Sequence, residues 1–261
     1  PGWERWRLTF EEAAAPIREW LIRELAPQRG DTILELSAGV GDTGFEAAAI
    51  VGERGRLIST DFASDMVEAA RRRSEELGLA NVEHRVMDAE HVELEDDSVD
   101  GVLCRFGYML MADPAAALSE TRRVLRPGGR LAFAVFASAE RNPWASICAR
   151  LFVERGHAPP PEPGTPGIFA LGSEERTRGL LEEAGFTNVR MEEVPMRFLF
   201  TDLDEYLSWA TNTAGALAMV LRGLPGHELE WIEAELERAF APFAVDGGYE
   251  LPGVALVAVA S

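Results

Sequence analysis

The sequence predicts an α/β protein with a doubly wound, mostly parallel sheet and a mainly helical cap. Apolar runs of strand length alternate with amphipathic helical patterns between residues 32 and 136. A glycine-rich turn at residues 39–44 joins the first of these runs to the next helix. Alternating strands and helices with right-handed crossovers form a parallel sheet. A chain of 261 residues with 47% hydrophobic content can build one large domain of this kind.

The first predicted element is an amphipathic helix that Pro27 terminates. Its apolar side chains recur at helical spacing, at Ile17, Trp20, Leu21 and Leu25. A short strand at residues 32–36 leads into the glycine turn. Residues 45–51 are rich in alanine and predict the start of the next helix.

Further strands are predicted at residues 56–60, 82–86 and 101–104. We expect Ser64 to cap the helix after the first of these strands, and Gly78 to follow its end. The run at 101–104 is almost entirely apolar, which is typical of a strand covered on both faces. Asp113 and Pro114 suit the cap and first position of another helix. A turn at 126–129 and a fifth strand at 130–136 follow.

The regular order ends after residue 137. Residues 141–172 contain six prolines and little periodicity, and a long irregular segment in a compact domain is usually functional. We expect a lid here, with a passive surface excursion as the alternative. A helix capped by Ser173, a strand at 189–200, helices at 203–222 and 227–241 and a strand at 253–260 complete the chain.

These elements predict a single domain over residues 1–261. Its core is expected at about 28–140, 173–200 and 251–261. The cap or lid is expected at about 1–27, 141–172 and 201–250.

Charge and composition limit the partners, the metal ions and the cellular compartment that are expected for this chain. The formal net charge of −19 repels phosphate backbones, so no nucleic-acid partner is expected. Two cysteines are too few for a disulfide framework and fit reduced thiols in a cytoplasmic protein. The histidines lack metal-ligand spacing, so no metal site is predicted. We expect no leader and no membrane span, and the sequence leaves the oligomeric state open, a homodimer included.

The glycine turn is compatible with two classes of cofactor. Gly39, Gly41 and Gly44 form G-x-G-x-x-G, the dinucleotide-binding pattern, at the N-terminus of a helix. Glu35 would place a carboxylate beside this turn, which is unfavourable for a pyrophosphate and suits a ligand that carries an ammonium group. An NAD(P)-dependent oxidoreductase would also need a Tyr-x-x-x-Lys or comparable pair, and the chain contains no lysine.

Five segments over roughly residues 30–137 carry a family resemblance: ILELSAGVGDTG, STDFASDMVEAA, VEHRVMDAE, DDSVDGVLCRFG and DPAAALSETRRVLRPGGRLAFAVF. In this order they resemble the class I S-adenosylmethionine-dependent methyltransferases, especially the ubiquinone/menaquinone-biosynthesis-like (methyltransferase type 11) family. The resemblance implies a Rossmann-like core, S-adenosylmethionine as cofactor and S-adenosylhomocysteine as product. It also implies methyl transfer to a small-molecule acceptor by direct in-line displacement. A non-catalytic S-adenosylmethionine-binding protein is the alternative.

The resemblance also indicates which residues hold the cofactor. Glu35 suits the ammonium group, and Asp61, twenty residues after Gly41, suits the two ribose hydroxyls. Asp88 suits the exocyclic amine of adenine, while Phe62 and Met66 can enclose the adenine ring. The other positions carried over are Ser37, Gly39, Gly41, Ala89, Cys104 and Arg105. Of these, Ser37 stands where the family pattern has a glycine.

The acceptor is expected outside the carboxyl ends of the strands, near the chain that follows the fourth strand. Four residues are candidates for its pocket, with core packing as the alternative for each: Trp6, Tyr108, Trp144 and Phe169. No residue stands out as a general base, and we expect His157 to be an exposed loop residue. Cys104 is expected to pack rather than to act as a nucleophile.

Overall fold

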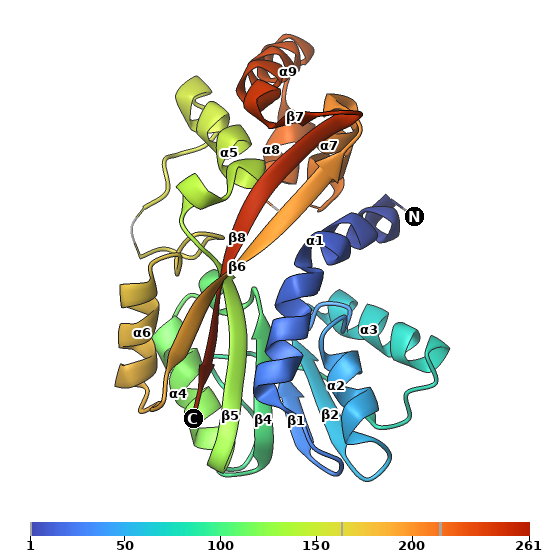
Figure 1. The fold of residues 1–261 in the computed structure, drawn as a ribbon, viewed down its shortest axis with the longest axis vertical. Helices are drawn as coiled ribbons and strands as arrows, with labels where there is room; N and C mark the ends of the chain where they lie inside the picture. The colour runs from blue at the N-terminus through green and yellow to red at the C-terminus, as the bar shows by residue number, and fades with distance from the viewer. Residues whose placement is uncertain (1, 163, 214–215) are drawn as a thin grey trace. The chain divides into compact units, whose positions relative to one another are not determined.

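The computed structural model describes residues 2–162, 164–213 and 216–261. Its sheet has the strand order β3-β2-β1-β4-β5-β8-β6 (Figure 1). The parallel strands are β1 (Thr32–Glu35), β2 (Arg56–Asp61), β3 (Val82–Val86), β4 (Val99–Arg105) and β5 (Leu125–Phe136). Strand β8 (Gly248–Ala260) pairs antiparallel with β5 and lies next to β6 (Arg190–Phe200). A doubly wound, mostly parallel sheet is therefore confirmed.

The chain divides into two compact units. The helical unit comprises Pro1–Pro16, Ser138–Pro163 and Pro195–Val254. The sheet unit comprises Ile17–Ala137, Gly164–Val194 and Ala255–Ser261. These boundaries differ from the predicted core and cap because α1 (Gly2–Leu25), β6 and β8 each contribute residues to both units. Prolines stand at three of the crossings: Pro16 within α1, Pro195 within β6, and Pro163, which lies outside the described residues.

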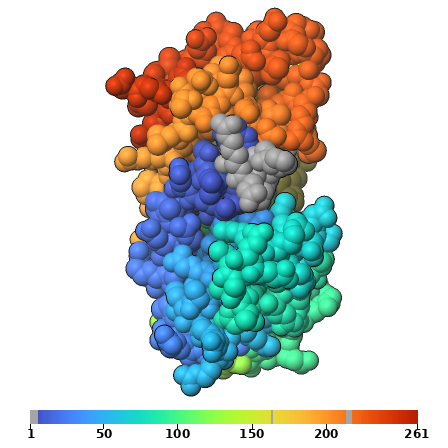
Figure 2. Space-filling model, turned by 90° about the vertical axis from the view of Figure 1, so that its right-hand side faces the viewer, coloured from blue at the N-terminus to red at the C-terminus, as the bar shows by residue number. Residues whose placement is uncertain are grey.

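In the sheet unit, helices cover both faces of the parallel strands (Figure 1). Helices α2 (Gly44–Val51) and α3 (Ser64–Glu76) lie on one face, and Figure 2 presents this side. Helices α4 (Pro114–Val124) and α6 (Glu174–Glu183) lie on the other. The buried side chains of Ile17, Leu21 and Leu25 confirm the predicted apolar face of the first helix. The caps predicted at Asp113 and Ser173 are confirmed by bonds from the backbone N–H groups of Ala116 and Arg176.

The helical unit has an aromatic core. It contains α5 (Pro143–Arg155), α7 (Leu203–Thr213), α8 (Ala216–Gly223) and α9 (Gly226–Phe240). The Trp144 ring stacks on Phe198 at 4.6 Å, and Trp209 contacts both rings at 5.7 Å. The buried Asn142 side chain bonds the backbone N–H and carbonyl of Val254 at 3.0 and 3.1 Å. These contacts join segments that are far apart in the sequence.

Four local predictions are wrong. Residues 143–155 of the expected irregular stretch form α5, because Pro143 occupies the first turn and apolar residues such as Cys148, Leu151 and Phe152 recur at helical spacing. Ser64 is the first residue of α3 and not its cap; Ala63 precedes it without a side-chain bond. The turn expected at 126–129 lies within β5, where an irregular register against β4 accommodates it. The helix expected at 203–222 is two helices, and residues 214–215 lie outside the described residues.

Candidate functional site

The buried carboxyl group of Glu35 lies at the end of β1, where the residue is 2% exposed. Its Oε1 accepts a hydrogen bond from the Gly44 backbone N–H at 2.7 Å. Its Oε2 has no hydrogen-bond partner among the described residues. Burial raises the pKa of Glu35 to about 8, although the Gly44 N–H and the charge of Arg105 oppose this shift. A buried acid with one unpaired oxygen suits a cationic group of a ligand.

Backbone sterics shape the turn that follows β1. A Cβ at Gly44 would collide with Glu35 Oε2, and one at Gly41 would collide with the ring of Phe45. Gly41 also has a φ of +83°, in the left-handed region that glycine adopts readily. Ser37 adopts a φ of +52°, which is uncommon for a residue with a side chain. The turn therefore brings its main chain directly against the Glu35 carboxyl group.

Asp61, at the end of β2, connects this turn to the start of α3. Its Oδ2 accepts from the Gly39 N–H and its Oδ1 from the Ala63 N–H, both at 2.9 Å. Each carboxylate oxygen has a second lone pair, so both can still accept from ligand hydroxyls. Phe62 is 77% exposed, and Met66 in the first turn of α3 is half-buried. An exposed ring and a flexible thioether thus lie next to this acid in the sequence.

Asp88 follows β3 on an irregular loop. The Met87 N–H donates to the Asp61 carbonyl at 3.0 Å, which joins the ends of β2 and β3. Asp88 is exposed, and its Oδ1 accepts from the Glu90 N–H at 2.9 Å. Ala89 beside it is buried. The loop itself therefore orients this carboxylate.

The chain after β4 packs closely against the glycine turn. A Cβ at Gly107 would lie 2.6 Å from Ser37 Oγ and 2.7 Å from Cys104 Sγ. Cys104 is fully buried, and burial raises the pKa of its thiol to about 12. The thiol is thus protonated at neutral pH and is a poor nucleophile. Arg105 is half-buried, and its charge lowers the pKa of Glu35.

The structure brings the predicted cofactor residues to one edge of the sheet unit. Glu35, Asp61 and Asp88 stand at or just after the carboxyl ends of β1, β2 and β3, which are neighbours in the order β3-β2-β1. The turns after β1 and β4 meet at Ser37 and Gly107. This edge is where open parallel sheets bind ligands.

The four acceptor candidates fall in different units. Tyr108 of the sheet unit is fully buried, with its hydroxyl 2.6 Å from Thr121 Oγ1. Phe169 of the same unit is half-buried. Trp6 and Trp144 are both buried within the helical unit. The contacts of Tyr108 and Trp144 are those of packing residues.

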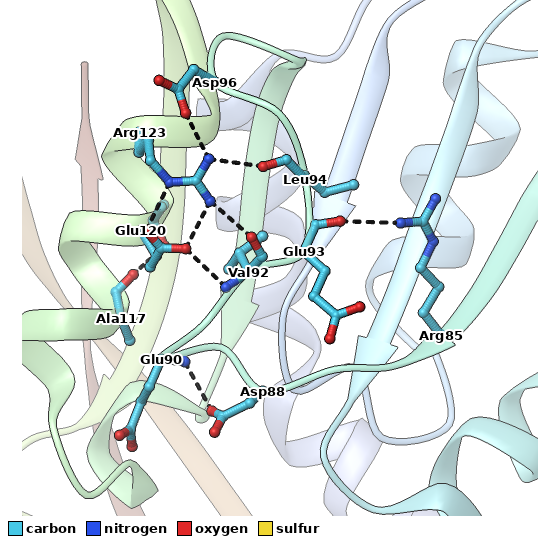
Figure 3. Close-up of polar contacts among 11 residues, drawn as sticks. Arg85, Asp88, Glu90, Val92, Glu93, Leu94, Asp96, Ala117, Glu120 and Arg123 are labelled. Atoms are coloured by element: carbon cyan, nitrogen blue, oxygen red, sulfur yellow. Dashed lines mark hydrogen bonds and ion pairs between the residues drawn. The ribbon is translucent and has the colours of Figure 1, made fainter.

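Sequence analysis missed two arginines that hold loops of this edge. Arg73 of α3 donates to the Val40 carbonyl at 2.9 Å and pairs with Asp42 at 2.6 Å. Arg123 of α4 binds the loop after β3 (Figure 3). Glu120 at i,i+3 spacing from Arg123 was the only sequence signal. The loop partners are mainly backbone carbonyls, which a sequence does not reveal.

His157 is half-buried and not exposed, because its Nε2 lies 3.1 Å from Glu228 Oε2 within the helical unit. Within the described part of the chain, no group of three or more His, Cys, Asp or Glu side chains is placed to hold a metal ion. None of the described helices has both the length and the apolar composition of a bilayer span.

A family model described as a methyltransferase domain matches residues 27–185, more than half of the chain. The chain belongs to the methyltransferase domain family. The match contains β1 to β5 and the turns that carry Glu35, Asp61 and Asp88. The family resemblance predicted from the motifs is therefore confirmed.

A demethylmenaquinone methyltransferase from Clavibacter sepedonicus is 37% identical over 133 residues, covering 51% of this chain and 48% of the relative. In three curated relatives the aligned part covers 22%, 48% and 53% of the relative's length. The chain thus spans about half or less of these relatives.

Two solved structures share the fold of this methyltransferase-family chain. The YcgJ protein from Bacillus subtilis has a TM-score of 0.63 at 18% identity, covering 93% of this chain and 96% of that chain. A SAM dependent methyltransferase from Aquifex aeolicus has a TM-score of 0.54 at 24% identity, covering 70% of this chain and 87% of that chain. At these identities the likeness shows the fold and not the substrate.

Proposed function

We propose that this chain binds S-adenosylmethionine at the edge formed by β1, β2 and β3 and directs methyl transfer to a small-molecule acceptor. One observation carries the proposal: among the residues that the structure describes, the buried Glu35 Oε2 has no hydrogen-bond partner, and it lies beside a glycine turn. A dinucleotide pyrophosphate would bring negative charge to this acid, whereas the cofactor's ammonium group would neutralise it. Both the charge of the site and its family favour S-adenosylmethionine.

The residues at the strand ends divide the recognition of the cofactor among them. Glu35 would meet its ammonium group, Asp61 the ribose hydroxyls and Asp88 the adenine amine. Phe62 and Met66 would enclose the adenine ring, with Ala89 beside Asp88. Ser37, Gly39, Gly41, Cys104 and Arg105 would line the methionine end through their backbone.

The cofactor supplies a methyl group already activated on a sulfonium. The chain then has to align the acceptor, exclude water and, for some acceptors, take up a proton. Cys104 is not needed for this chemistry, because direct displacement has no covalent enzyme intermediate and its thiol is buried and protonated.

The acceptor is proposed as a small molecule: a quinone precursor, a phenol, a polyketide-like metabolite or an amine. The relative from Clavibacter sepedonicus is named for a quinone substrate, which supports the first of these. Among the acceptor candidates, Phe169 has the exposure needed for direct contact. Tyr108, which is buried in the sheet unit, would shape the site from beneath its surface, whereas Trp6 and Trp144 are buried in the helical unit and stay predictions from the sequence. The two buried free cysteines support a reducing, cytoplasmic location.

Calorimetry with S-adenosylhomocysteine and with NAD(H) tests the cofactor. We expect saturable binding of the first and none of the second; the reverse result would support an NAD(P)-dependent oxidoreductase. Transfer of a labelled methyl group to a metabolite panel separates an enzyme from a non-catalytic binding protein. Once this panel has identified an acceptor, Phe169→Ala should raise the KM for that acceptor and leave the cofactor affinity unchanged.

A further inference from the structure

The loop between β3 and β4 carries Asp88 but contains no helix or strand of its own. Figure 3 shows how α4 holds it. Arg123 donates from Nη2 to the Val92 carbonyl and from Nη1 to the Leu94 carbonyl, both at 2.8 Å. Its Nη1 also contacts Asp96 Oδ1 at 2.7 Å. One guanidinium group thus binds three residues of a segment that has no ladder of backbone bonds.

Glu120 lies one turn earlier on α4 and pairs with Arg123 (Figure 3). Glu120 and Arg123 together form the anchor of this loop. Oε1 and Oε2 of Glu120 accept from Nε and Nη2 of Arg123, both at 2.7 Å. Its Oε2 also accepts from the Val92 N–H at 2.9 Å. Hydrogen bonds from Arg123 lower the pKa of Glu120, so the pair stays ionised at neutral pH. Two-point contact between a planar guanidinium group and a carboxylate fixes the orientation of both.

A second attachment lies closer to Asp88. Glu90 Oε1 accepts from the N–H groups of Ala112 and Asp113 at 2.7 and 3.1 Å. The Glu90 N–H donates to Asp88 Oδ1, and the His91 N–H donates to the Asp88 carbonyl at 3.1 Å. Val92, which Glu120 and Arg123 bind, follows His91 directly in the chain. A continuous run of bonded residues therefore links the anchor to the exposed Asp88 carboxylate.

We propose that Glu120 and Arg123 are positioning residues that hold the Asp88 loop in the conformation that recognises the cofactor's adenine amine. The inference rests on the proposed function, since it assigns the amine to Asp88. Packing does not fix the direction of an exposed carboxylate on an irregular loop. The anchor removes this freedom before the ligand arrives, which improves affinity by lowering the entropy lost on binding.

The test measures two ligands by calorimetry: S-adenosylhomocysteine and S-inosylhomocysteine, in which an oxygen replaces the adenine amine. Wild-type protein should bind the adenine compound more tightly, and Asp88→Asn should reduce that preference. Arg123→Met should weaken binding of the adenine compound by about tenfold and change binding of the inosine compound little. The matched control is Arg122→Met, because Arg122 is a half-buried neighbour on α4 whose one hydrogen bond to a described residue is a long one, to the Leu125 carbonyl at 3.4 Å. It should leave both affinities within about twofold.

Two further measurements test the positioning role independently of Arg123→Met binding: hydrogen exchange of the loop, and ligand preference in a Glu120 variant. In the ligand-free Arg123→Met variant, backbone amides of residues 88–94 should exchange hydrogen faster, while those of the Arg122→Met variant should not. Glu120→Gln keeps the acceptor for Val92 and loses the charge, so it should show a smaller loss of preference. This variant replaces Arg123→Met if the latter unfolds below the temperature of measurement.

The outcomes separate the two proposals. If the wild type fails to bind S-adenosylhomocysteine, or binds both ligands equally, the assignment of the site fails and the positioning role fails with it. A second outcome is that the wild type prefers the adenine compound and Asp88→Asn loses this preference. If Arg123→Met then keeps the preference at the wild-type strength, only the positioning role is overturned. Equal weakening of both ligands by Arg123→Met also overturns it, because a general structural role affects both alike.

Discussion

A proton on Glu35 decides whether the carboxyl group beside the glycine turn is neutral or negative. Its pKa of about 8 in the folded state lies above the ordinary value of 4.5. Between these two values the folded chain therefore holds a proton that the unfolded chain has released. The contribution of Glu35 to the free energy of unfolding is full below pH 4.5 and decreases as the pH rises toward 8.

The same proton makes cofactor binding depend on pH. An ammonium group beside Glu35 favours the ionised carboxylate, so binding below pH 8 should release a proton. The affinity for S-adenosylhomocysteine should rise from pH 6 to pH 8, by up to about tenfold per pH unit. Calorimetry in two buffers of different ionisation enthalpy measures the proton released. Glu35→Gln should show a flat profile, and a flat wild-type profile would contradict the assignment.

Asp61 has a structural task in addition to its proposed ligand contact. Its carboxylate accepts hydrogen bonds from the N–H groups of Gly39 and Ala63, so Asp61→Ala removes the acceptors of two backbone donors. We expect this variant to weaken S-adenosylhomocysteine binding by about 1–3 kcal/mol and to lower the melting temperature. Asp61→Asn keeps one acceptor oxygen and should lose less of both. Calorimetry and thermal denaturation measure the two effects, and normal affinity in Asp61→Ala would show the ribose contact to be misassigned.

At the scale of secondary-structure elements, α5 is fixed by its aromatic neighbours. Trp144 in its first turn stacks on Phe198 of β6 and meets Trp209 of α7 edge to face. Its Nε1 donates to Asn142 Oδ1 at 3.1 Å, and its backbone carbonyl accepts from the Tyr206 hydroxyl at 2.9 Å. The side chain therefore connects three elements of the helical unit.

Trp144→Ala should lower the free energy of unfolding by about 3–5 kcal/mol, because it opens a cavity between these elements. Denaturant titration followed by circular dichroism measures the change. Leu199→Ala is the matched control on β6, since this side chain is 60% exposed and its removal should cost little. An unchanged midpoint for Trp144→Ala would show that this ring is not a core residue in solution.

At the scale of the whole molecule, the predicted cofactor residues all belong to one unit. Glu35, Asp61, Asp88 and Arg105 lie within Ile17–Ala137. Saturation with S-adenosylhomocysteine should therefore slow amide exchange at residues 37–44, 61–66 and 87–91. Exchange in α9 of the helical unit should change little. Hydrogen exchange followed by mass spectrometry checks both, and protection confined to α9 would place the ligand elsewhere.

The sheet unit was more predictable than the helical unit for a physical reason. Strand ends between residues 30 and 137 are marked by glycines and acids such as Gly41, Asp61 and Asp88, and each strand is a short apolar run. The helical unit depends on contacts between distant residues, such as Trp144 with Phe198, for which the sequence has no local signal. The role of Arg123 could not be predicted for the same reason, because its partners are mostly main-chain atoms of a distant loop.

The five crossings of the chain between the two units have a consequence for folding during synthesis. The ribosome completes β1 to β5 by residue 136, but β8, which pairs with β5, is made more than a hundred residues later. The helical unit likewise starts before residue 17 and is not finished until residue 254. The sheet unit cannot close until the whole helical unit has been made, so the edge of β5 stays open to wrong partners during that interval.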